Sequence, residues 1–204
     1  MQKVKVRKFV NSVFGSNTYV IHDGCEALIV DAGDLAPVRG YVAANGLRVT
    51  AILLTHTHYD HIYGLRLYME AWPEATVYTS EFGRQALANP KWNFSRYHDD
   101  PVSIESPRVV AIADDDEIPA PAGTTLRAFL TPGHDASCVS YAGDRRLFCG
   151  DSYIPGVKVF DTFPHSDRKA APMWRARLRE MSRTLRAYPG HGVVVAASNF
   201  NIDP

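Results

Sequence analysis

The chain has 204 residues, of which 46% are hydrophobic and 22% are charged, and these proportions are typical of a globular protein. Its 22 basic and 22 acidic side chains balance, so the overall charge favours neither nucleic acid nor an acidic membrane as a partner. A chain of this length can bury one good core, so we expect a single domain over residues 1–204.

The sequence also bears on the cellular compartment. The first residues alternate charged and apolar side chains and lack the apolar core of a secretory signal, and no run is long enough to span a membrane. Three cysteines without Cys-x-x-Cys spacing argue against a disulfide framework. We therefore expect a cytoplasmic protein with no membrane partner, and the oligomeric state stays open.

Strands and helices alternate in the first half of the chain. Apolar runs, alternating or continuous, predict strands at 3–10, 18–21, 27–30, 49–54 and 76–78. Helical spacing and capping residues predict helices at 35–44 and 61–71, and a third helix capped by Ser80.

An aromatic loop follows at 89–107. It contains three prolines and no clear period, and it carries Trp92, Phe94 and Tyr97 beside His98. Such a segment is either a lid whose rings line a substrate pocket or a flap that packs onto the neighbouring helix. If it is a lid, Trp92 and Phe94 are candidate pocket walls that select the substrate.

The second half is expected to form a second sheet. Strands are predicted at 109–113, 124–130, 138–141 and 146–149, with a last strand at 193–197. A helix that starts at Pro172 has an apolar stripe on one face. A different face of this helix carries Arg175, Arg179, Arg183 and Arg186.

The segment from Thr55 to His61 (THTHYDH) directly follows an apolar strand and holds His56, His58, Asp60 and His61. Alternate side chains of an extended segment share one side, so the first three ligands can face one point while His61 reaches a second point. A solvated turn rich in histidine is the alternative interpretation. Four potential ligands in so short a segment favour a site for metal ions.

Three later loops place a potential ligand after glycine, which permits a sharp turn and a close approach of the backbone. They are Gly133-His134, Gly150-Asp151 and Gly190-His191. Together with the first loop they suggest two ligand sets: His56, His58 and His134, and Asp60, His61 and His191, with Asp151 shared between them. Imidazole and carboxylate ligands suit two zinc ions, with iron or manganese as alternatives.

The order His-x-His-x-Asp-His, Pro-Gly-His, Gly-Asp, Pro-Gly-His-Gly resembles the metallo-β-lactamase superfamily, over residues from about Phe14 to Gly192. The resemblance implies an α/β fold, an αβ/βα sandwich of two mixed β-sheets flanked by helices, with the metal site at one edge. Asp151 stands where one large subclass of zinc β-lactamases carries cysteine. The site therefore resembles the glyoxalase II and lactonase type, here without the C-terminal glutathione-binding domain of glyoxalase II.

The resemblance implies a metallo-hydrolase in which two divalent ions activate a bridging hydroxide against an ester, thioester, lactone or related small-molecule substrate. Asp60 would ligate one ion and orient the hydroxide. Asp31, at the end of an apolar strand, would brace the histidine loop unless it is a plain turn residue. Tyr153 would either donate a hydrogen bond to the substrate or pack against its neighbours.

Two other functions fit the same fold. A mononuclear-iron sulfur dioxygenase would use the ligands differently, and metal content and oxygen uptake would distinguish it. The arginine face of the last helix raises the possibility of a nuclease or nucleic-acid-binding protein. A solvated helix face explains these arginines more simply, so no nucleic acid is expected as a partner.

Overall fold

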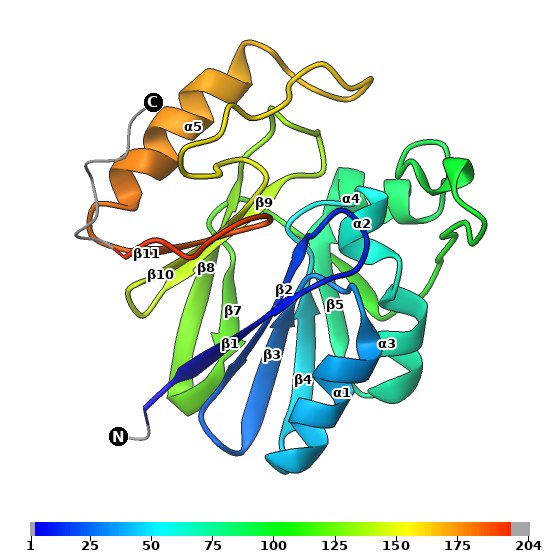
Figure 1. Cartoon of the computed structure of the whole chain (residues 1–204), viewed down its shortest axis with the longest axis vertical. Coiled ribbons are helices and arrows are strands. Elements are labelled where there is room, and N and C mark those ends of the chain that lie inside the picture. The colour runs from blue at the N-terminus through cyan, green and yellow to red at the C-terminus, as the bar shows by residue number, and fades with distance from the viewer. Residues whose placement is uncertain (1–2, 197–204) are drawn as a thin grey trace.

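Two β-sheets pack face to face and helices cover their outer sides in the computed structural model, which describes residues 3–196 (Figure 1). This layer order confirms the predicted αβ/βα sandwich. Within the described residues, every helix is too short or too polar to cross a membrane.

The first sheet has six strands in the order in which they occur along the chain. They are β1 (Lys5–Val10), β2 (Asn17–His22), β3 (Glu26–Val30), β4 (Arg48–Leu53), β5 (Thr76–Ser80) and β6 (Val109–Ile112). The first three strands pair antiparallel, and β3 to β6 pair parallel. Parallel strands require crossovers, which contain α1 (Leu35–Ala44), α2 (Tyr59–Ile62), α3 (Leu65–Ala71) and α4 (Glu81–Leu87).

The second sheet has five strands, in the order β11-β10-β9-β8-β7. They are β7 (Glu117–Ala120), β8 (Thr124–Leu130), β9 (Val139–Gly143), β10 (Arg146–Gly150) and β11 (Arg186–Pro189). Among the described residues, β10 and β11 form the one parallel pair of this sheet. The connection between them contains α5 (Ala170–Met181). Two parallel pairs, β3 with β4 and β10 with β11, therefore end in loops at the same edge of the sandwich.

The main core fills the space between the sheets. Its large, fully buried side chains include Tyr19, Leu28, Leu53, Tyr141 and Phe148. A second cluster lies between the first sheet and α1 and α3, and a small one lies beneath α5. Burial on both faces explains why β2 and β3 have apolar side chains on both sides rather than a strict alternation.

The strand predicted at 109–113 was assigned to the wrong sheet. It forms β6, which pairs parallel with β5 through Val77 and Val109. The apolar pattern of a strand predicts that it is buried but not which strand it pairs with. The aromatic loop before it is the connection that returns the chain to the first sheet.

Two strands, β7 and β11, were not predicted. Strand β7 contains Pro119, which is tolerated because this strand lies at the edge of its sheet. The strand predicted at 193–197 is reduced to one bridge between Ala187 and Val195, and residue 197 lies outside the described residues.

The helix predicted at 61–71 is interrupted and forms α2 and α3. Ala32, just after β3, donates its N–H to the His61 carbonyl (2.8 Å) and accepts a hydrogen bond from the Gly64 N–H (2.9 Å). These contacts use backbone groups that a continuous helix would pair internally. The interruption fixes the histidine loop to the end of β3.

Gly64 lies so close to this junction that a methyl group there would overlap the Gly33 carbonyl oxygen. We expect Gly64→Ala to lower the free energy of unfolding by about 3 kcal/mol, the upper part of the range for overpacking. Gly40, on the exposed side of α1, has nothing within 4 Å of an added methyl group. Gly40→Ala should instead stabilise by up to about 1 kcal/mol, because alanine favours the helix. Urea denaturation of both variants measures this contrast, and equal effects would contradict it.

Candidate metal centre

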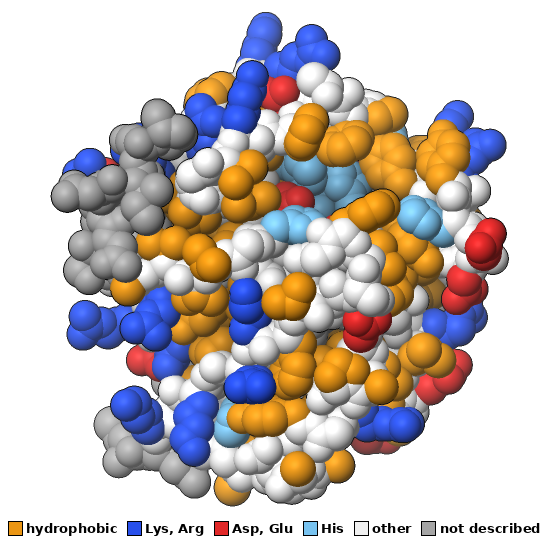
Figure 2. Space-filling model, viewed as in Figure 1, with side chains coloured by type: hydrophobic (Ala, Val, Ile, Leu, Met, Phe, Trp, Pro, Cys, Tyr) orange, Lys and Arg blue, Asp and Glu red, His pale blue; other side chains and the backbone are white. Residues whose placement is uncertain are grey.

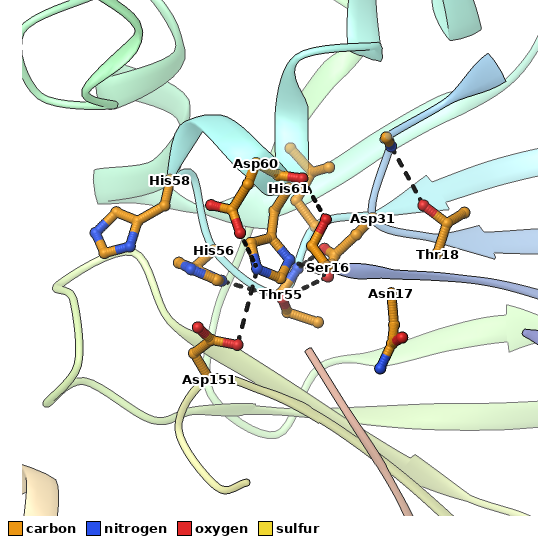
Figure 3. Close-up of polar contacts among 12 residues, drawn as sticks. Ser16, Asn17, Thr18, Asp31, Thr55, His56, His58, Asp60, His61 and Asp151 are labelled. Atoms are coloured by element: carbon orange, nitrogen blue, oxygen red, sulfur yellow. Dashed lines mark hydrogen bonds and ion pairs between the residues drawn. The ribbon is translucent and has the colours of Figure 1, made fainter. Parts of the chain in front are cut away.

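All seven predicted ligands converge at the edge where the two parallel strand pairs end. Figure 2 shows histidine side chains at the base of a hollow in this surface, and Figure 3 shows how the residues around Asp31 lie. In each of three groups the possible ligand atoms lie within 4.8 Å of one another. The groups are His56, His58 and His134; Asp60, His61 and His191; and His56, His61 and Asp151. The first two are the predicted sets, and ligation itself stays a prediction.

Asp151 lies between the two sets. One carboxylate oxygen, Oδ1, is 3.7 Å from His61 Nε2. The other, Oδ2, is 3.7 Å from His134 Nε2 and 3.5 Å from His191 Nε2. Because the carboxylate faces histidines of both sets, it is placed where a group shared by two ions would have to be.

Asp31 fixes the histidine loop through its carboxylate. Its backbone has φ 59°, a left-handed conformation that few residues other than glycine adopt. Oδ1 accepts from the Thr55 N–H (2.7 Å), while Oδ2 accepts from the Thr55 hydroxyl (2.8 Å) and lies 2.9 Å from His61 Nδ1. The bracing geometry implied for Asp31 is therefore present in the structure.

These contacts orient two of the histidines. His61 donates from Nδ1 to Asp31, so its Nε2 is the ring nitrogen that faces Asp60 and His191. The Thr55 hydroxyl gives its proton to Asp31 and can accept from His56 Nδ1 at 3.2 Å. His56 Nε2 then carries a free lone pair directed into the site.

The other two buried histidines are oriented from the opposite side. His134 donates from Nδ1 to the Phe160 carbonyl (2.7 Å), so its Nε2 faces His58 Nδ1 at 3.0 Å. His58 Nε2 points away from the site and lies 3.5 Å from Oδ2 of the buried Asp135. The two ring nitrogens that meet here either share one proton in a hydrogen bond or, with both lone pairs free, can accept a cation between them.

The donor set fits metal ions. His56 Nε2 and Asp151 Oδ1 are buried and have no hydrogen-bond partner among residues 3–196, although buried polar atoms are normally paired. A methyl group at Gly190 would overlap Asp151 Oδ1, so only glycine lets this backbone approach the carboxylate. Buried imidazole and carboxylate atoms without protein partners are suited to divalent transition metals.

The electrostatics of the site favour a cation. Burial lowers the pKa of His56, and the neighbouring histidines lower it further, so this ring is neutral. Burial acts to raise the pKa of Asp60, but His61 and His191 outweigh it and hold the pKa well below its usual range. Burial likewise acts to lower the pKa of His61, but the Asp60 and Asp31 carboxylates raise it well above its usual value. Carboxylates that stabilise a positive charge on His61 would also stabilise a metal ion beside it.

Asp135 is a residue of the site that the sequence analysis missed. Its carboxylate accepts from the Ser137 N–H and hydroxyl, and the Ser137 hydroxyl oxygen accepts in turn from the Thr57 N–H. Asp135 thus connects the His134 loop to the histidine loop. Its position directly after a predicted ligand was the available signal.

The other candidates lie outside this cluster. Tyr153 is partly buried against the small cluster beneath α5, as its packing alternative predicted, and a catalytic role for its hydroxyl stays a prediction. His98 stacks on Tyr59 with ring centroids 3.7 Å apart, and His165 lies beside Phe82 and Trp92.

We expect Asp135→Asn to weaken metal binding about 10- to 100-fold, the usual cost of losing the partner that orients a ligand histidine. Asparagine can still accept from Ser137, but it removes the negative charge that faces His58 Nε2 at 3.5 Å. Competition with a chromophoric chelator measures the affinity. Asp99→Asn, at an exposed aspartate, is the control, and equal affinities in both variants would contradict a role for Asp135 in orienting His58.

Known proteins resemble this chain in sequence. The family model of the metallo-beta-lactamase superfamily matches residues 11–191. A probable metallo-hydrolase of Streptococcus pyogenes serotype M6, M6_Spy0554, is 28% identical over 195 residues, which are 93% of this chain and 84% of that protein. The atrochrysone carboxyl ACP thioesterase of Aspergillus fumigatus is 28% identical over 192 residues, 89% of this chain. The match covers 52% of the thioesterase, so this chain spans about half of its length.

The fold also resembles a solved structure. The B3 metallo-beta-lactamase BLEG-1 superposes with a TM-score of 0.83 over 95% of this chain and 94% of that chain, at 24% sequence identity. This likeness concerns the fold alone. With a family model that spans nearly the whole sequence and a matching fold, the chain belongs to the metallo-beta-lactamase superfamily.

Proposed function

We propose that this protein is a dinuclear metal-dependent hydrolase that acts on an ester, thioester, lactone or related carbonyl compound. The observation that carries the proposal is the position of Asp151, whose two carboxylate oxygens face histidines of both ligand sets. A mononuclear site would need neither a second set nor a carboxylate between the sets.

His56, His58 and His134 would hold one ion, and Asp60, His61 and His191 the other, with Asp151 shared. Two divalent ions bound there would supply a hydroxide nucleophile at neutral pH and polarise the substrate carbonyl. Zinc is the first choice for this set of nitrogen and oxygen ligands, with iron or manganese as alternatives.

The protein's own groups would provide orientation and charge. Asp60 Oδ2 lies 3.1 Å from His191 Nε2 and 3.3 Å from His61 Nε2, and its backbone carbonyl accepts from the Ser16 hydroxyl (2.7 Å). Its lowered pKa keeps the carboxylate ionised, so Asp60 can accept a hydrogen bond from an attacking water but cannot act as a general acid. Asp31 and Asp135 would position His61 and His58.

The relatives support hydrolysis as the reaction, and one of them supports a thioester as the bond. One is described as a probable metallo-hydrolase and the other as a thioesterase. The sulfur dioxygenase alternative requires one iron, so the presence of a second ligand set favours the hydrolase. The nuclease alternative loses support because the four arginines do not share one helix face: α5 ends at Met181, so Arg183 lies beyond it, and Arg186 begins β11. Arg183 also pairs with Glu180 (3.1 Å).

We expect close to two transition-metal ions per chain in the metal-replete protein. Elemental analysis measures this stoichiometry. Removing the ions with a chelator should abolish hydrolysis and lower the melting temperature, because ions that bind only the folded state add their binding free energy to its stability. One ion per chain under replete conditions would contradict the dinuclear proposal, and oxygen uptake with that ion would favour the oxygenase.

We expect Asp151→Ala to reduce kcat by more than about 100-fold, because both ions would lose a shared ligand. Loss of a group that only orients a ligand costs up to about 100-fold, and loss of the ligand itself should cost more. The melting temperature of the chelated protein should change little, since Asp151 lies at the edge of the sandwich rather than in its core. Asp99→Ala, at an exposed site, is the matched control. Near-normal kcat with two bound ions would show that Asp151 is not shared.

A further inference from the structure

Three phenylalanine rings form a connected group beside His58 and His134 of the first ligand set. Figure 2 shows hydrophobic side chains around the histidines in the surface hollow. Phe94 belongs to the aromatic loop at 89–107, while Phe160 and Phe163 belong to the segment between β10 and α5. We call these three residues the aromatic wall.

The wall contacts the first ligand set directly. The ring centroids of Phe94 and Phe163 each lie 5.0 Å from that of His58, and Phe163 lies 5.5 Å from His134. Phe94 and Phe163 meet each other at 5.6 Å, and Phe160 follows at 6.3 Å from Phe163. Segments from the two halves of the chain therefore join over one of the two metal positions.

One side of the wall is held by the aromatic loop. Phe94 has φ 61°, a conformation that costs a bulky residue energy and persists only where the surroundings impose it. The buried Asn93 side chain donates to the carbonyls of Ala86 and Val102, both at 2.9 Å. The loop is thus fixed at its middle, and the Phe94 ring is directed toward His58.

The other side of the wall is held by the His134 loop. The Phe160 carbonyl accepts from His134 Nδ1, and the Ser166 hydroxyl donates to the His134 carbonyl (2.6 Å). The Asp167 N–H donates to the Gly133 carbonyl (2.8 Å). Correct placement of a metal ligand and placement of these rings therefore depend on the same contacts.

The wall faces solvent, unlike the other predicted pocket residue. Phe160 is 69% exposed and Phe163 is 38% exposed. Trp92 instead stacks in parallel on Phe82 of α4, with centroids 5.3 Å apart, so it forms the packed flap. Exposed apolar rings next to a site of converging polar groups are typical of a ligand-binding surface.

We propose that the aromatic wall binds an uncharged apolar group of the substrate, an aromatic ring or a short alkyl chain, beside the scissile bond. This inference rests on the proposed hydrolase function. The apolar group can belong to the acyl part or to the leaving alcohol or thiol, because both adjoin the carbonyl that the metal centre attacks.

Two ester series on the zinc-loaded protein test the proposal and distinguish these sources. In the first, the leaving group is constant and the acyl group runs from acetyl to butanoyl and phenylacetyl. In the second, the acyl group is acetyl and the leaving alcohol runs from ethanol to butanol and benzyl alcohol. We expect kcat/KM to rise about 10-fold or more in one series, the range for an added apolar contact in a binding pocket.

Phe163→Ala should reduce this preference to less than about 3-fold, and Phe163→Leu should restore much of it, since lost apolar contact is the cause. Phe160→Ala keeps the carbonyl that binds His134 and tests the outer part of the wall. Tyr97→Ala is the control, because Tyr97 is an aromatic residue of the loop that carries Phe94, is 72% exposed and lies against Arg96. An unchanged preference in Phe163→Ala, with normal folding and metal content, would overturn the proposal.

A binding measurement separates failure of the wall from failure of the hydrolase proposal. Calorimetry should find that the zinc-loaded protein binds phenylacetate or butanoate about 10-fold more tightly than acetate, and that Phe163→Ala removes the difference. If the protein shows this binding preference but hydrolyses no ester, the aromatic-wall proposal stands and the hydrolase proposal fails. If it hydrolyses esters but shows no preference in either series or in binding, the hydrolase proposal stands and the aromatic-wall proposal fails.

Discussion

The carboxylate of Asp31 is the contact on which the metal centre depends. It lies at the end of β3 and accepts three hydrogen bonds from the loop that follows the neighbouring parallel strand, β4. Hydrogen bonds to a buried charged group each contribute roughly 1.5 to 3 kcal/mol. They determine where the loop lies. Because they also fix the orientation of the Thr55 hydroxyl and of His61 Nδ1, they determine which ring nitrogens face the site.

The same arrangement works against the stability of the fold. Six of the seven converging side chains are buried. Several of their polar atoms have no hydrogen-bond partner among the described residues. Burying polar atoms without partners costs free energy, so a core built for stability alone would not contain them. The apolar clusters on both sides of the first sheet offset this cost and let the loops keep their strained conformations.

Rigid strand ends and irregular loops have different roles in this site. The candidate ligands lie in loops at the ends of strands, because strands in a buried sheet move little. The irregular segments around 94 and 160–163 surround them and carry residues that do not ligate. Such loops can change in sequence without disturbing the strand ends, which is how one metal site in this superfamily could serve different substrates. In this chain the two loops are held by hydrogen bonds to His134 and to α4, so they form a preformed surface.

The sequence by itself determined which residues form the converging cluster and much of the local structure. The spacing of His56, His58, Asp60 and His61 after an apolar strand was sufficient to predict the converging cluster, and α1 and the Ser80 cap of α4 agree with the local signals. Such features depend on neighbours within a few residues, so period and capping chemistry reveal them.

Only the tertiary structure decided the features that depend on partners distant in the chain. The placement of β6 in the first sheet, the interruption between α2 and α3, and the contact of Asp135 with His58 each join segments that no local pattern relates. The aromatic loop is the clearest example, because Trp92 and Phe94 are two residues apart and of similar character. One packs on α4 and the other faces His58, since the left-handed turn at Phe94 and the anchoring of Asn93 direct the two rings to different neighbours.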